Sequence, residues 1–110
     1  AGEPARAERG EEYLKATLAT DEGAARLGEI GIGTNFGIDR PVGAILFDEK
    51  IGGTMHLALG SGYPETGSTN SSGLHWDMVI DTRSKAKVVA NGNLLLQNGR
   101  FAEKRFPQPK

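Results

Sequence analysis

Residues 74–80 read Leu-His-Trp-Asp-Met-Val-Ile, and this run decides the expected fold. Its aromatic, aliphatic and β-branched residues favour a strand, in which successive side chains point to opposite faces of a sheet. His75 and Asp77 would therefore lie on one face, with Trp76 and Met78 on the other. An imidazole and a carboxylate side by side on a sheet face suit a divalent metal ion.

Three further strand patterns surround this run. Residues 54–59 predict a strand that carries His56, and a loop rich in Gly, Ser, Thr and Asn joins it to residue 74. Residues 27–33 predict another strand, with Glu29 on the face opposite Ile30 and Ile32. Asn91-Gly92 is the strongest short signal for a β-hairpin, between residues 86–90 and 94–96.

Helical patterns precede or interrupt these strands. Residues 11–18 have helical composition, and Asp21 could cap a short second helix that ends at Gly28. Pro41 could open a third helix that stops at Gly52-Gly53. A helical N-terminal segment followed mostly by strands predicts an α+β fold, with a mostly antiparallel sheet and long Gly-rich loops.

Length and composition limit the possible functions. The chain has 110 residues, which is one small domain, and a formal net charge of −1, which favours neither nucleic acid nor a charged membrane surface as partner. It has no cysteine, which excludes a disulfide framework, a thiolate zinc site and a cysteine nucleophile. No apolar run is long enough for a membrane span, and we expect a cytoplasmic protein. We expect a mobile lead-in over 1–10, one domain over 11–103 and a loose tail over 104–110.

The chemically informative residues are two histidines and three carboxylates. They are Glu29, Glu49, His56, His75 and Asp77. Such a set resembles the ligands of a two-metal hydrolytic site. The alternative for each residue is an ordinary structural role, such as a solvated strand face for Glu29 or a charged helix end for Glu49. The glycine pattern of residues 28–33 lacks a P-loop lysine, and no G-x-S-x-G motif is present, so nucleotide binding and serine catalysis are disfavoured.

Three segments together resemble a known family. LGEIGIGTN, FDEKIGGTMHLALGSGYPETG and NSSGLHWDMVID look like the C-terminal part of the thermophilic metalloprotease family, the aminopeptidase T type of metallo-aminopeptidase. The resemblance implies a pair of divalent ions (Zn, Co or Mn) and removal of N-terminal residues from peptide substrates. It implies metal binding by Glu29, Glu49, His56, His75 and Asp77. It implies a catalytic role for Tyr63. A carboxylate that is not fully used as a ligand could shuttle the proton, and we expect Glu29 in this role.

The resemblance also implies an incomplete enzyme. The family has a larger N-terminal domain and one more metal-binding glutamate upstream, neither of which matches this sequence. We therefore expect residues 11–103 to be a C-terminal catalytic domain that is inactive alone. Its partner would be a second copy, as in a homo-oligomer, or the missing N-terminal domain or chain.

The sequence leaves two other functions open. Some iron-dependent ring-cleaving dioxygenases look similar to this family, and His and carboxylate ligands also suit non-haem Fe(II). A non-catalytic binding or assembly module that kept the fold is the other alternative, and the missing glutamate favours it.

Overall fold

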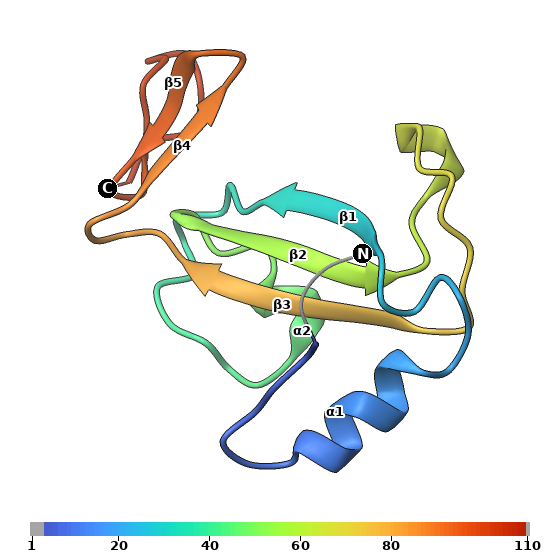
Figure 1. The fold of residues 1–110 in the computed structure, drawn as a ribbon. Helices are drawn as coiled ribbons and strands as arrows, with labels where there is room; N and C mark the ends of the chain where they lie inside the picture. Colours follow the sequence, from blue (N-terminus) through green and yellow to red (C-terminus); the bar gives the residue numbers. More distant parts are fainter. Residues whose placement is uncertain (1–3, 110) are drawn as a thin grey trace. The chain divides into compact units, whose positions relative to one another are not determined.

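The computed structural model describes residues 4–109 and contains, within them, two three-stranded β-sheets (Figure 1). The first sheet has the order β1-β2-β3, and the second has the order β4-β5-β6. Neighbouring strands run antiparallel, which confirms the antiparallel sheet expected from the sequence. The strands are β1 (Leu27–Ile32), β2 (Thr54–Gly60), β3 (His75–Asp81), β4 (Lys87–Ala90), β5 (Asn93–Gln97) and β6 (Arg100–Phe101).

Helices contribute little to the fold. Within residues 4–109, α1 (Glu11–Leu18) is the one helix of more than seven residues. The others are the single turn α2 (Ile45–Asp48) and the 3₁₀ turn η1 (Pro64–Thr66). No helix in the described part of the chain is long and apolar enough to cross a membrane.

The chain divides into two compact units. The first holds the residues up to Glu29 together with Ala58–Trp76, and the second holds Ile30–Leu57 and the residues from Asp77 onward. In the first unit the buried apolar residues are Ala24 and Ala58. In the second they are Ile51, Leu96 and Phe101, and the Phe101 ring packs edge-on against Phe36 and Phe106.

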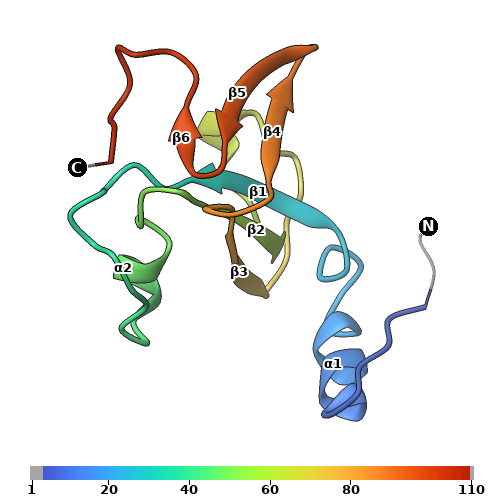
Figure 2. The ribbon, with the colours of Figure 1, turned by 90° about the vertical axis from the view of Figure 1, so that its left-hand side faces the viewer.

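The second sheet is built from two tight hairpins, seen side by side in Figure 2. Asn91 and Gly92 both have positive φ, 52° and 80°, as a two-residue type I′ turn requires. Asn98 and Gly99 repeat the conformation, with φ values of 50° and 80°. The hairpin expected at Asn91-Gly92 is therefore confirmed, and the second turn adds the short strand β6.

The helix expected from Pro41 to Gly52-Gly53 is wrong at both ends, because α2 covers only Ile45–Asp48. It begins only at Ile45, because Gly43 has a φ of 80°, outside the right-handed helical region. The Asp48 carboxylate accepts hydrogen bonds from the backbone N–H groups of Val42 and Gly43, at 2.8 and 3.1 Å. Residues 41–44 therefore form a loop that this carboxylate holds.

The short helix expected after Asp21 is also wrong. Residues 21–26 form turns, and Leu27 already begins β1. The Asp21 carboxylate accepts hydrogen bonds from the Ser72 hydroxyl and the Gly73 N–H, at 2.7 and 2.8 Å. The Asn70 amide donates to the carbonyl of Gly23 at 2.9 Å. These partners from a distant loop hold the segment in a turn.

The expected ends of the chain are only partly described. The lead-in over 1–10 and the tail over 104–110 include residues 1–3 and 110, which lie outside the described residues. The division into lead-in, domain and tail stays a prediction.

Candidate metal centre

Three of the five predicted ligands come together. Glu29 of β1, His56 of β2 and Asp77 of β3 each offer one ligand atom, and these atoms lie within 4.8 Å of one another. Among the described residues, this is the one group of three or more His or carboxylate side chains that could hold a metal ion. The order β1-β2-β3 explains it, because each neighbouring strand contributes one side chain to the same face.

The side chains of this group are withdrawn from solvent. His56 is only 6% exposed, on a strand whose residues alternate between buried and half-buried. The atoms Glu29 Oε2, His56 Nδ1 and Asp77 Oδ1 are all inaccessible to solvent. Buried imidazole and carboxylate groups are expected to be paired or to coordinate a metal. One nitrogen and two carboxylate ligands suit a divalent ion such as Zn²⁺ or Mn²⁺, so the residues present fit the metal that the sequence predicts.

Gly31 creates the space for the His56 ring. A Cβ atom built on Gly31 would lie 2.1 Å from His56 Cε1 and 2.3 Å from Nε2. The imidazole therefore packs directly on the backbone of β1, where any side chain would displace it. Gly31 is not among the site residues predicted from the sequence. The available signal is a glycine inside a strand pattern, which often marks a close approach of another group.

His75 and Tyr63 form a second cluster, within the first unit. His75 Nδ1 donates a hydrogen bond to the carbonyl oxygen of Ser61, at 2.6 Å. A carbonyl only accepts, so Nδ1 carries a proton in this contact. The Tyr63 ring lies 6.2 Å from the His75 ring, centroid to centroid, and is 58% exposed. His75 shares the strand β3 with Asp77 but is not part of the group of three.

Glu49 is not part of the group of three either. It follows the last residue of α2 and forms an ion pair with its neighbour Lys50. The predicted roles of Glu49, His75 and Tyr63 therefore stay predictions.

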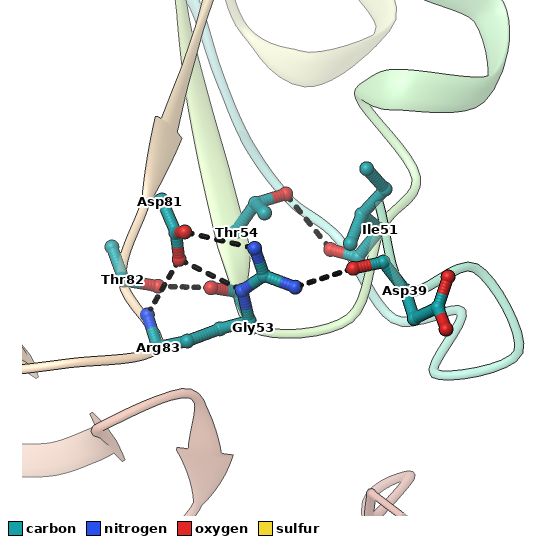
Figure 3. Close-up of polar contacts among 7 residues, drawn as sticks. All are labelled: Asp39, Ile51, Gly53, Thr54, Asp81, Thr82 and Arg83. Atoms are coloured by element: carbon teal, nitrogen blue, oxygen red, sulfur yellow. Dashed lines mark hydrogen bonds and ion pairs between the residues drawn. The ribbon is translucent and has the colours of Figure 1, made fainter. Parts of the chain in front are cut away.

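A charged network lies further along β3 (Figure 3). The Arg83 guanidinium donates to both carboxylate oxygens of Asp81, at 3.0 and 2.9 Å, and to the carbonyl of Asp39, at 2.6 Å. The hydrogen bonds with Arg83 hold the pKa of Asp81 below its ordinary value, and Asp81 in turn raises the pKa of Arg83. The network is therefore charged on both sides at neutral pH.

Comparison with known proteins gives a family match over most of the chain. The model of the thermophilic metalloprotease family matches residues 4–101. Aminopeptidase T of Thermus thermophilus is 40% identical over 73 residues, which are 62% of this chain and 17% of that protein. Aminopeptidase T of Thermus aquaticus is 40% identical over 72 residues, 61% of this chain and 17% of the relative. No solved structure matches.

Proposed function

Since this chain belongs to the thermophilic metalloprotease family, we propose that it forms the metal-binding domain of a metallo-aminopeptidase. The observation that carries the proposal is the group of Glu29, His56 and Asp77, whose potential ligand atoms lie within 4.8 Å of one another. The chain spans about 17% of the length of each curated relative. We assign the activity to a longer polypeptide. The isolated chain should not hydrolyse peptides by itself.

Five side chains would hold the metal ions. Glu29, His56 and Asp77 would bind the first divalent ion, and Glu49 and His75 would contribute to a second. The contact with Ser61 supports this role for His75, because a hydrogen bond from Nδ1 to a carbonyl fixes the orientation of the ring, as is common for metal-bound histidines. When bound, such ions supply Lewis acidity that polarises a water molecule and the scissile carbonyl. We expect zinc, cobalt or manganese.

The remaining roles fall to Glu29 and Tyr63. A carboxylate that is not fully used as a ligand can accept the proton of the attacking water, and we assign this to Glu29. The exposed Tyr63 hydroxyl, next to His75, would donate a hydrogen bond to the oxygen on which negative charge develops. The substrate would be a peptide with a free N-terminus.

Association with another chain or domain is part of the same proposal. No residue of α1 is buried, and Tyr13 on this helix is 73% exposed. An apolar residue so exposed is a candidate contact for a second copy or for another domain of the longer protein. A cytoplasmic location stays a prediction. The two alternative functions were a ring-cleaving dioxygenase and a non-catalytic binding or assembly module. The comparisons support neither of them, since both curated relatives named above are aminopeptidases.

Metal titration of the 110-residue chain tests the centre directly. We expect calorimetry with Zn²⁺, Co²⁺ and Mn²⁺ to detect binding that Asp77→Asn weakens at least about a hundredfold, because a charged ligand is lost. A metal at about a hundred times its Kd should also stabilise the native chain by about 2.7 kcal/mol, and Asp77→Asn should reduce this gain to about 0.4 kcal/mol or less at the same metal concentration.

Asp81→Asn is the matched control, because it removes the same charge from the same strand at a residue that pairs with Arg83. It should leave metal affinity unchanged. Equal metal affinity of Asp77→Asn and the wild type would overturn the proposed centre. In the longer polypeptide, Tyr63→Phe should lower turnover while metal content stays intact.

A further inference from the structure

The half-buried residue Asn70 joins two segments of the first unit. Its side-chain amide donates to the carbonyl oxygen of Gly60 at 2.6 Å and to that of Gly23 at 2.9 Å. In the backbone, the Asn70 carbonyl accepts a hydrogen bond from the Gly62 N–H at 3.2 Å. Asn70 therefore contacts the residues on both sides of Ser61.

These hydrogen bonds fix the two peptide groups that meet at Ser61. In the first peptide group, the Gly60 carbonyl accepts from Asn70. The N–H of the same group, that of Ser61, donates to the Leu74 carbonyl at 2.7 Å. In the second peptide group, the Gly62 N–H donates to the Asn70 carbonyl. A trans peptide group is planar, so its N–H and its C=O point in opposite directions. The bond from Gly62 to Asn70 therefore also sets the direction of the Ser61 carbonyl.

The residues around Ser61 make this backbone dependent on its hydrogen bonds. Ser61 lies between Gly60 and Gly62, and glycine has more accessible backbone conformations than any other residue. Of the four backbone groups in the two peptide groups, Asn70 is the partner of two, the Gly60 carbonyl and the Gly62 N–H. Loss of Asn70 would therefore release the segment on both sides of Ser61.

The Ser61 carbonyl in turn orients the ring of His75. His75 Nδ1 donates to this carbonyl at 2.6 Å, and the residue is exposed. The terminal torsion of a histidine is broad, so a hydrogen bond to a fixed acceptor restricts an exposed ring strongly. A backbone carbonyl that accepts from one ring nitrogen fixes both the orientation and the tautomer of a metal-binding histidine. The orientation of His75 therefore depends on a carbonyl that Asn70 holds in place.

We propose that Asn70 is a positioning residue for His75 and acts through the Ser61 carbonyl. The inference rests on the proposed function, in which His75 contributes to the second metal ion. Asn70 itself binds neither metal nor substrate in this role. Its hydrogen bonds keep the Ser61 carbonyl where it selects one ring orientation and the tautomer with a proton on Nδ1.

The test is NMR of the imidazole nitrogens in the 110-residue chain, without metal and at about pH 8.5, where an ordinary histidine is neutral. In the wild type, the His75 tautomer with a proton on Nδ1 should predominate. Asn70→Ala should lower the ratio of the Nδ1–H to the Nε2–H tautomer of His75 at least about fivefold, as expected for one hydrogen bond of ordinary net strength. His56 is the other histidine of the sequence and serves as an internal control, so its signals should stay unchanged.

Two control variants separate positioning from a general loss of stability. Thr69→Ala changes the exposed neighbour of Asn70 in the same loop. Leu96→Ala destabilises the second unit, because it leaves a cavity at a buried position. Both controls should keep the wild-type tautomer ratio of His75. If Asn70→Ala does not fold, Asn70→Ser, which keeps one donor, should lower the ratio at least about twofold.

The outcomes separate this inference from the proposed function. An unchanged His75 ratio in the Asn70 variant, or an equal fall in Leu96→Ala, would overturn the positioning role and leave the proposed aminopeptidase intact. In the full-length polypeptide that carries this chain, Asn70→Ala should weaken binding of the second ion at least about tenfold and leave the first ion unaffected. Equal affinity for the second ion would also overturn the inference. If that polypeptide has no chelator-sensitive peptidase activity, the proposed function fails, and the His75 ratio alone decides the role of Asn70.

Discussion

The two sheets differ in how their strands meet. In β4-β5-β6, consecutive strands are joined by the two-residue turns at Asn91-Gly92 and Asn98-Gly99. In β1-β2-β3, long loops separate the strands, and the contacts that hold those loops come from distant residues such as Asn70 and Asp21. The first sheet carries Glu29, His56 and Asp77, whereas β4-β5-β6 carries none of the predicted ligands.

This difference shows where the candidate chemistry is located. Local turns can form a hairpin without burying polar groups, and most residues of β4 and β5 are exposed. Buried ligands need several strands to converge, because one segment alone cannot surround an imidazole and two carboxylates. Substitutions in the first sheet should therefore have larger effects than comparable ones in the second.

The largest effect is expected for Gly31→Ala. A methyl group there would meet the buried His56 ring at 2.1 Å, and we expect a loss of about 3 kcal/mol in the free energy of unfolding. Urea denaturation measures it. In a His56→Ala background the clash is absent, so the same substitution should cost at least about 2 kcal/mol less. An equal cost in both backgrounds would show that the ring does not require this glycine.

The next effect concerns Asn70, which connects distant parts of the first unit. Its side-chain amide donates to the carbonyls of Gly60 at 2.6 Å and of Gly23 at 2.9 Å. Asn70→Ala would leave these acceptors without that donor, and we expect a loss of about 2 kcal/mol. Asn93→Ala, at an exposed position on β5, is the control and should change stability by no more than about 0.5 kcal/mol. Similar losses for both variants would contradict the proposed difference between the sheets.

A smaller effect is expected in the second sheet, from Gly92→Ala. No atom lies within 4 Å of the added Cβ, so the cost is only that of a φ of 80°, about 1 kcal/mol. Gly92→Asn should cost less, because asparagine tolerates this conformation better. Thermal unfolding of the two variants tests whether Gly92→Ala is more destabilising than Gly92→Asn. If Gly92→Ala lowered the stability as much as Gly31→Ala, the proposed difference between the two sheets would be wrong.

The smallest effect, and one that depends on pH, is expected for Asp21→Asn. The Gly73 N–H and then the Ser72 hydroxyl hold the pKa of Asp21 below its ordinary value. A carboxylate with a lowered pKa in the folded state adds stability above its unfolded pKa of about 3.9 and loses it as pH falls through the folded pKa. The wild type should therefore exceed Asp21→Asn in stability at pH 7, and the gap should narrow below about pH 4. Urea unfolding at pH 7, 5, 3.5 and 2.5 tests this, and a gap that does not change with pH would contradict it.

The sequence alone determined the local structure. The Asn91-Gly92 dipeptide favours one turn type, and alternation of side chains identified the segments of β2 and β3, because both signals depend on neighbouring residues. The family resemblance was likewise readable from three short segments, and the family match supports it. The helices predicted from Pro41 and after Asp21 were wrong. Near Pro41, the positive φ of Gly43 and its hydrogen bond to Asp48 determine the backbone, and Asp21 is held by Ser72 from a distant loop.

Only the tertiary structure decided which polar residues are buried together. In β1, Ile30 is 61% exposed while an oxygen of Glu29 is buried, the reverse of what hydropathy predicts. The reason is that β2 and β3 bring His56 and Asp77 to the Glu29 face, which no local pattern encodes. The place of Gly31 under the His56 ring likewise depends on segments far apart in the chain.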